Sequence, residues 1–186
     1  MDFIDFTAPS HLVAPQLIGC QFFVNNVGGV IVEVEAYDQA EPASHTFSGP
    51  SVRNAAMFGP PGCAYVYRSY GIHWCLNFVC SPADHGAGVL IRAIEPTAGI
   101  ENMRERRGGI INERLLCSGP GRVGQALAIG PHLNGASLAA SPFKLLPPQA
   151  PVRWIQGPRV GISKAVDLPW RFGALDSPFL SRPFRH

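Results

Sequence analysis

The chain has 186 residues, of which 46% are hydrophobic and 15% charged, and its formal net charge is +2. This composition excludes an intrinsically disordered protein and fits one compact domain over residues 1–186. No apolar run approaches the roughly 18 residues of a membrane-spanning helix. The acidic start also lacks the basic region of a secretory signal, so we expect an intracellular protein with no membrane partner.

The basic residues and the cysteines carry weaker signals. Lys144 and Lys164 are the only lysines among fifteen basic residues, and the rest are arginines. Arginine suits bidentate contacts to phosphate, although a GC-rich genome produces the same bias. The five cysteines form no C-x-x-C pair and the histidines lack zinc-binding spacings, so we expect no metal, no other cofactor, and reduced, buried thiols.

The first predicted elements lead to a long strand. Residues 10–18 are typical of a short helix closed by Gly19, although Pro15 would kink it or delay its start. Residues 20–24 predict a strand, and 25–29 predict a hairpin turn.

The strand over residues 30–37 is the most informative segment. Because side chains alternate along a strand, Val30, Val32, Val34 and Ala36 should face a core. The opposite face then carries Ile31, Glu33, Glu35 and Tyr37. A carboxylate and an aromatic ring, two residues apart, therefore share one surface. Such a face is most often simply solvated.

The middle of the chain predicts a loop, a hairpin, a strand and a helix. The elements expected in this order are a loop over 38–62, hairpin arms over 64–69 and 74–80, a strand over 88–94, and a helix over 97–107. The length of the loop favours a functional role.

Arg92 lies within the apolar strand 88–94 and argues against a solvated face for the earlier strand. An unpaired buried charge is very costly, so this arginine must reach a surface or a carboxylate. Glu33 and Glu35 are the obvious partners on a strand. A buried pair of this kind is equally consistent with a purely structural role.

The hairpin concentrates aromatic and basic residues between Tyr65 and Trp74, with Tyr70 at or beyond the end of its first arm. A ring at a hairpin tip is exposed, which is unusual for a structural residue. Exposed rings beside cations suit stacking on nucleic-acid bases. They would also suit a protein interface.

Ser118-Gly119-Pro120-Gly121-Arg122 predicts the start of a helix that reaches about residue 129, with Ser118 as N-cap and Gly130 as terminator. The free N–H groups there favour an anion, although a simple cap is the commoner case. Three or four short strands should follow Pro131, including 160–162 and 170–172. The predicted fold class is α+β, a single domain with a curved, mostly antiparallel sheet flanked by helices and a protruding β-hairpin.

Several short motifs, in a fixed order over nearly the whole chain, resemble those of the alkyladenine (3-methyladenine) DNA glycosylases. They are VEVEAY at 32–37, His45, RN at 53–54, MF at 57–58, 61–67, Tyr70-Gly71, Asn77, 89–96, 116–120, 125–129 and 159–161. Each motif is weak by itself, but their order and spacing together are specific.

The resemblance implies a role for each matched position. Glu35 would be the general base that activates water, and Arg92 would help to hold that water. Tyr37 on one side, with His45 and Tyr67 on the other, would enclose the flipped base, and Asn77 would exclude the 2-amino group of guanine. Tyr70 would enter the minor groove and fill the gap in the base stack. The implied DNA contacts are Met57, Phe58, Gly119, Pro120 and Arg122.

The implied activity is that of a monofunctional hydrolase of base excision repair, acting without a metal on double-stranded DNA that carries damaged purines. We expect a monomer, located in the cytoplasm or nucleoid if the source is bacterial. Two other functions use some of the same features. A non-enzymatic nucleic-acid-binding module would bind DNA but release no base. An N-glycosidase acting on free nucleosides would leave the exposed Tyr70 without a purpose.

Overall fold

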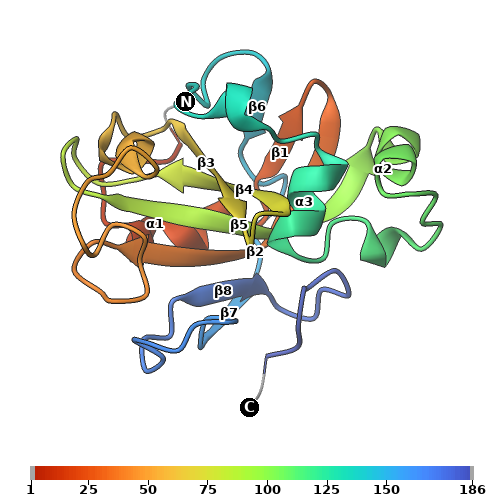
Figure 1. Cartoon of the computed structure of the whole chain (residues 1–186). Helices are drawn as coiled ribbons and strands as arrows, with labels where there is room; N and C mark the ends of the chain where they lie inside the picture. The colour runs from red at the N-terminus through yellow and green to blue at the C-terminus, as the bar shows by residue number, and fades with distance from the viewer. Residues whose placement is uncertain (1–2, 185–186) are drawn as a thin grey trace.

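The structure of the chain is a computed structural model that describes residues 3–184. An antiparallel sheet with the strand order β3-β4-β5-β2-β1-β6 forms its centre, and β8 pairs with β2 and β7 with β8 (Figure 1). The strands are β1 (Gln21–Val24), β2 (Val27–Asp38), β3 (Ala64–Ser69), β4 (His73–Val79), β5 (Ala87–Ala98), β6 (Phe143–Leu146), β7 (Trp154–Gly157) and β8 (Arg171–Ala174).

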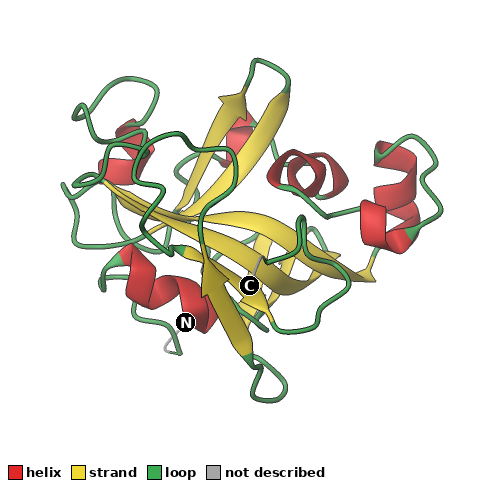
Figure 2. Ribbon diagram, turned by 90° about the horizontal axis from the view of Figure 1, so that it is seen from below, coloured by secondary structure: helices red, strands yellow, loops and turns green. Residues whose placement is uncertain are grey.

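The helices lie outside the sheet, and α1 packs against its central strands β2 and β5 (Figure 2). They are α1 (Ser10–Leu17), α2 (Ile100–Arg106) and α3 (Pro120–Ala126), with short 3-10 turns over Ala55–Phe58, Glu113–Leu115 and Pro131–Leu133. The predicted α+β class with a mostly antiparallel sheet is therefore confirmed. Within residues 3–184, no helix is both long enough and apolar enough to cross a membrane.

One hydrophobic core joins α1 to the sheet. Its fully buried members include Leu17 of α1, Phe22 of β1, Phe78 of β4 and Ile91 of β5. Burying a side chain of this size contributes roughly 1.5–3 kcal/mol. The core thus fixes the strands that carry the polar residues described below.

Strands β2 and β5 form the long central pair, which brings Glu35 opposite Leu90. Their register shifts on both sides of Glu33, as at a β-bulge. Ile31 is consequently buried in the core, while Val30 is only partly buried, so the predicted alternation is wrong at these two positions. A bulge adds one residue to one strand and reverses the face of those beyond it. Glu33 and Glu35 are both 0% exposed, so this face is not solvated, as the buried charge of Arg92 indicated from the sequence.

Several predicted boundaries differ from the structure. The turn is confined to Asn25 and Asn26, which adopt positive φ angles of 49° and 63°, and the rest of the predicted turn belongs to β2. Strand β5 continues to Ala98, so α2 begins only after Gly99, whose φ is 69°. The segment 160–162 is not a strand.

The caps predicted for α3 are also wrong. Gly119 occupies the N-cap position with a φ of 141°, a conformation that favours glycine. Ser118 instead forms a bridge to Ala93 of β5. At the other end the chain turns at Ala128, whose φ is 55°, and the N–H of Ile129 donates to the carbonyl of Gly124 at 2.8 Å. The helix therefore ends before the predicted terminator Gly130.

Candidate active site

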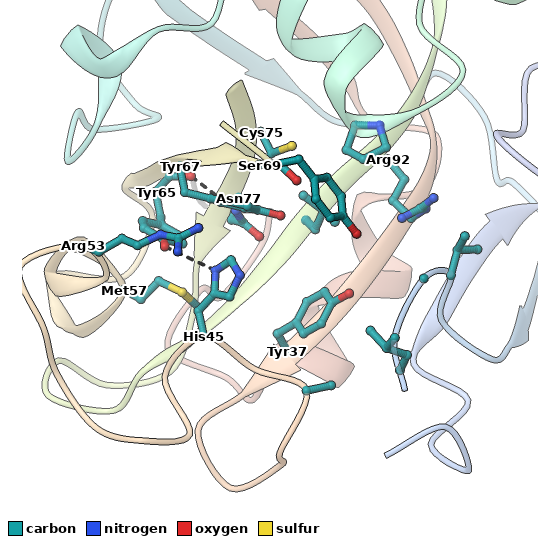
Figure 3. A pocket seen from close by; sticks show the side chains of 17 residues that line it. Tyr37, His45, Arg53, Met57, Tyr65, Tyr67, Ser69, Cys75, Asn77 and Arg92 are labelled. Atoms are coloured by element: carbon teal, nitrogen blue, oxygen red, sulfur yellow. Dashed lines mark hydrogen bonds between the residues drawn. The ribbon is translucent and has the colours of Figure 1, made fainter. Parts of the chain in front are cut away.

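A cavity of about 550 Å³ opens between the sheet and the loops above it (Figure 3). Strands β2, β3, β4 and β5 contribute walls, and so do the loop before residue 54 and the segment Val160–Ile162. Most of the predicted site residues meet here. Those that line it are Tyr37, His45, Met57, Tyr67, Tyr70, Asn77, Arg92 and Pro120.

Glu35 lies immediately behind this wall and does not itself line the cavity. Its carboxylate accepts three hydrogen bonds. Tyr37 Oη donates to Oε2 at 2.9 Å, Arg92 Nη1 donates to Oε2 at 3.2 Å, and the backbone N–H of Val160 donates to Oε1 at 2.7 Å. All three donor residues line the cavity. A carboxylate has about four acceptor positions, two on each oxygen. The described residues fill both positions on Oε2 and one on Oε1, so the second acceptor position on Oε1 is left for another donor.

Arg92 is held by more than Glu35. Its Nε donates to Glu33 Oε1 at 3.3 Å, and its Nη2 donates to Ser181 Oγ at 3.3 Å. Glu33 also accepts from Arg171 Nε at 2.6 Å. Burial alone would lower the pKa of Arg92, but the charges of Glu35 and Glu33 outweigh it and raise the pKa. The predicted pairing of Arg92 with both carboxylates is confirmed.

Tyr37 stands across the cavity from a group of three rings (Figure 3). The rings of Tyr65 and Tyr67 stack with centroids 5.6 Å apart, and the His45 ring lies perpendicular to that of Tyr67 at 4.5 Å. Burial raises the pKa of Tyr65 to about 12. Burial also raises the pKa of Tyr67, and the neighbouring Cys75 raises it further. These phenols therefore stay neutral at any physiological pH.

His45 belongs to the loop that follows β2, and its Nδ1 lies 3.4 Å from Tyr65 Oη. Burial of its ring lowers the pKa, and the nearby charge of Arg53 lowers it further. The neutral imidazole is therefore the form favoured in the fold. It presents one donor and one acceptor nitrogen.

Asn77 and Met57 are buried within the cavity. Asn77 is held by a hydrogen bond from its Nδ2 to the carbonyl of Tyr65 at 3.4 Å. Met57 is only 2% exposed and packs against Tyr65 and Val79, while Phe58 beside it is partly buried. Met57 thus lies on the cavity wall and not on an outer surface.

Tyr70 projects from the tip of the β3–β4 hairpin. It is 90% exposed, has a φ of 48°, and is followed by Gly71 with a φ of 68°. A left-handed backbone is unfavourable for an aromatic residue. The ring nevertheless borders the cavity mouth. An exposed ring on a strained backbone beside a cavity is a feature found at functional sites.

Comparison with known proteins gives this geometry a family. The family model described as methylpurine-DNA glycosylase matches residues 4–178. The chain belongs to that family. It is 65% identical over 182 residues to a protein of Nitrosospira multiformis, covering 98% of this chain and 94% of the relative. It is 58% identical over 182 residues to a protein of Rhizobium meliloti, covering 97% and 96%. Both relatives are provisionally named 3-methyladenine DNA glycosylase.

Membership of the methylpurine-DNA glycosylase family confirms the resemblance noted from the motifs and places the chain among DNA glycosylases of base excision repair.

The segment Gly119-Pro120, which the resemblance implied as a DNA contact, adjoins the cavity through Pro120. Arg122 is exposed and folds back, donating from Nη1 to Ser118 Oγ at 2.9 Å. No cluster of three or more metal-ligating side chains occurs in the described part of the chain.

Several residues of the site were not assigned any role from the sequence, among them Tyr65 and Val160 of the cavity lining and the two members of a buried ion pair. Arg159 and Glu41 form a buried ion pair beside Tyr37, although residues 159–161 were recognised as a motif. Nothing local to either residue indicates the pairing, because 118 residues separate them. The matched motif was the only available signal.

Proposed function

We propose that the chain is a monofunctional DNA glycosylase that extrudes an alkylated or deaminated purine from duplex DNA and hydrolyses its N-glycosidic bond with a water activated by Glu35. One observation carries this proposal. The Glu35 carboxylate is bound by Tyr37, Arg92 and the Val160 amide, three groups that line an aromatic cavity. The product is an abasic site in an uncut strand.

The size and lining of the cavity support a purine as its ligand. Its volume of about 550 Å³ lies within the roughly 300–1,000 Å³ of small-molecule sites. Stacking of one base on aromatic side chains contributes about 1–3 kcal/mol, which offsets the few kcal/mol lost when a base leaves the duplex. Tyr37 would form one wall and the His45–Tyr67 pair the other. Asn77 and Met57 would then limit what fits at the floor.

The chemistry requires a negative charge and an oriented water beneath C1′, because the sugar becomes oxocarbenium-like as the bond breaks. We assign the water to the remaining acceptor position on Glu35 Oε1. Its oxygen bonds to C1′, its proton passes to Glu35, and the electrons of the C1′–N bond leave with the base. Arg92 and the Val160 amide can only donate hydrogen bonds, which suits a carboxylate acting as a base. A cationic alkylated purine leaves directly, whereas a neutral base needs a proton that Glu35 cannot supply in the same step.

Tyr70 would fill the gap left in the base stack, because its ring is exposed at the hairpin tip beside the cavity mouth. Gly119, Pro120 and Arg122 would contact the DNA backbone at the start of α3, which packs beside the β3–β4 hairpin, and Phe58 would lie close to the DNA. Met57, being buried in the wall, is better suited to contact the base than the opposite strand.

Replacement of Glu35 tests the proposal. Glu35→Gln preserves the shape and one acceptor oxygen, so we expect affinity for lesion-bearing duplex to persist while single-turnover base release is lost. Glu101→Gln is the matched control, because Glu101 lies on α2 with its side chain 80% exposed. Near-normal release by Glu35→Gln would refute the assigned base. A binding module would release no base even in the wild type, and a nucleosidase would cleave free nucleosides and ignore duplex DNA.

A further inference from the structure

Arg159 is a buried arginine with an extensive set of contacts next to the active-site wall. Its side chain is 0% exposed, and it forms a bidentate ion pair with Glu41, Nη1 to Oε1 at 2.6 Å and Nη2 to Oε2 at 2.9 Å. A buried ion pair is weak evidence for a stabilising role, because desolvation of both charges offsets their attraction. Its position therefore calls for another explanation.

The guanidinium of Arg159 reaches the segment of β2 that carries the site. Nη1 donates to the carbonyl of Ala36 at 2.9 Å, and Ala36 lies between Glu35 and Tyr37. Its central carbon also lies 4.6 Å from the centroid of the Tyr37 ring. One contact fixes the backbone from which both side chains leave, and the other covers one face of the Tyr37 ring.

A second ring backs the guanidinium. Arg159 lies 5.6 Å from the centroid of Trp170, whose ring in turn stacks on His11 with centroids 5.1 Å apart and an interplanar angle of 8°. The guanidinium thus contacts two aromatic rings, of Tyr37 and Trp170, and the Trp170 ring is braced by α1. Cation–π contacts of this kind are stronger when they are desolvated. Rotation of the Tyr37 ring would break its contact with the Arg159 guanidinium.

Arg159 also links the two loops that border the cavity. The next residue, Val160, donates its N–H to Glu35 Oε1 at 2.7 Å. On the other side, Glu41 Oε2 accepts from the backbone N–H of Ala43 at 2.8 Å. Ala43 and Val160 both line the cavity. One guanidinium therefore ties β2, the loop leading to His45 and the Val160 segment together.

We propose that Arg159, anchored by Glu41, is a positioning residue that holds the Tyr37 ring against the flipped base and the Val160 amide against Glu35. This inference rests on the proposed function. Arg159 touches neither the substrate nor the reacting atoms in this scheme. It acts through Tyr37 on base binding and through Val160 on the orientation of the carboxylate, so both steps should respond to its replacement.

Arg159→Lys keeps the charge but removes the planar fork. We expect the single-turnover rate of base release to fall between about 10-fold and about 100-fold in a folded variant, because a misplacement of about 1 Å in a catalytic site costs on that order. Arg104→Lys is the matched control. Arg104 forms an ion pair with Glu113 outside the cavity, and its variant should keep the wild-type rate.

A spectroscopic measurement separates positioning from stability. In the Glu35→Gln background, a duplex with one ethenoadenine should change its emission when the fluorescent base leaves the stack and packs on Tyr37. Adding Arg159→Lys should reduce this change while the thermal midpoint confirms folding. If Arg159→Lys does not fold, Glu41→Gln tests the positioning role instead. This variant removes the negative charge that pairs with Arg159 but keeps the shape of the Glu41 side chain. We expect a smaller loss in the same direction.

The outcomes distinguish the two proposals. Wild-type rates and emission changes in the folded Arg159 or Glu41 variants would overturn the positioning role and leave the Glu35 mechanism intact. Near-normal base release by Glu35→Gln alone would overturn the proposed function instead. Loss of both rate and emission change in a folded Arg159→Lys supports the inference.

Discussion

The Tyr37 hydroxyl donates a 2.9 Å hydrogen bond to Oε2 of Glu35, its neighbour on the same face of β2. Burial raises the pKa of Tyr37, and the charge of Glu35 raises it further. The phenol is therefore a permanent donor at physiological pH. Its ring lines the cavity while its hydroxyl binds the carboxylate behind the wall. One side chain thus connects the surface that would receive a base to the group that would activate water.

Replacing Tyr37 with phenylalanine separates these two contributions. Tyr37→Phe keeps the ring but removes one of the three donors to Glu35. A hydrogen bond to a charged group contributes about 1.5–3 kcal/mol, so we expect a roughly 10-fold or larger loss in the single-turnover rate of base release. Affinity for lesion DNA should change little. A rate equal to that of the wild type would show that this bond has no part in the reaction.

His45 provides a prediction about pH. Its pKa is lowered by burial and by the charge of Arg53, so the unfolded chain binds a proton at a higher pH than the folded chain does. The contribution of neutral His45 to the free energy of unfolding is complete above its ordinary pKa of 6.5. This contribution is lost as the pH falls through the lower pKa that His45 has in the folded chain. Arg53→Gln removes one cause of the shift.

In Arg53→Gln we expect the pKa of His45 to rise toward its ordinary value, as measured by NMR titration of the ring protons. The loss of unfolding free energy between about pH 7 and about pH 5 should then be smaller than in the wild type, because the gap between folded and unfolded pKa narrows. Arg104→Gln, remote from His45, should leave the pKa of His45 unchanged. An unaltered His45 titration in Arg53→Gln would exclude the proposed charge effect.

The strand pattern and the cost of a buried charge together predicted which side chains meet around Glu35, whereas the roles of these residues came only from the resemblance to the DNA glycosylases. Alternation along β2 correctly paired Glu35 with Tyr37, and the cost of a buried charge correctly predicted that Arg92 meets Glu33 and Glu35. Both arguments depend on local periodicity or on one unavoidable physical penalty. They hold because the relevant strands are adjacent in the sheet.

Other features depend on contacts that periodicity does not encode. The bulge at Glu33 follows from pairing with β5 and β8, and it exchanged the expected burial of Val30 and Ile31. Ser118 is drawn into a bridge with Ala93, which moves the start of α3 to Gly119. The Arg159–Glu41 pair spans 118 residues. Each of these is set by tertiary packing, which overrides the local preference of the residues involved.

The lysines provide a test of the monofunctional assignment. A lyase activity needs an amine that forms a Schiff base with the sugar, and none of the residues lining the cavity is a lysine. Lys144 lies on β6 opposite Phe23, and Lys164 is exposed beyond the cavity segment. We expect borohydride to trap no covalent adduct with lesion DNA, and Lys164→Gln to release bases at the wild-type rate. A trapped adduct that disappears in Lys164→Gln would assign a lyase step to that residue.

Tyr70 predicts a conflict between stability and function. Its φ of 48° costs a residue other than glycine, asparagine or aspartate roughly 1–2 kcal/mol, and with 90% exposure the ring buries too little to compensate. Asparagine tolerates the left-handed region, so Tyr70→Asn should raise the free energy of unfolding by up to about 1 kcal/mol. The same variant should bind lesion-bearing duplex more weakly, because the gap in the stack stays unfilled.

Urea unfolding measures the change in stability, and equilibrium binding measures the change in affinity for the duplex. Ile72→Asn is the control, because Ile72 lies two residues further along the same exposed tip. This control removes a similar apolar side chain without relieving the backbone strain at Tyr70. A Tyr70→Asn variant that is less stable than the wild type would mean that the ring makes contacts in the free protein that compensate for its strained backbone.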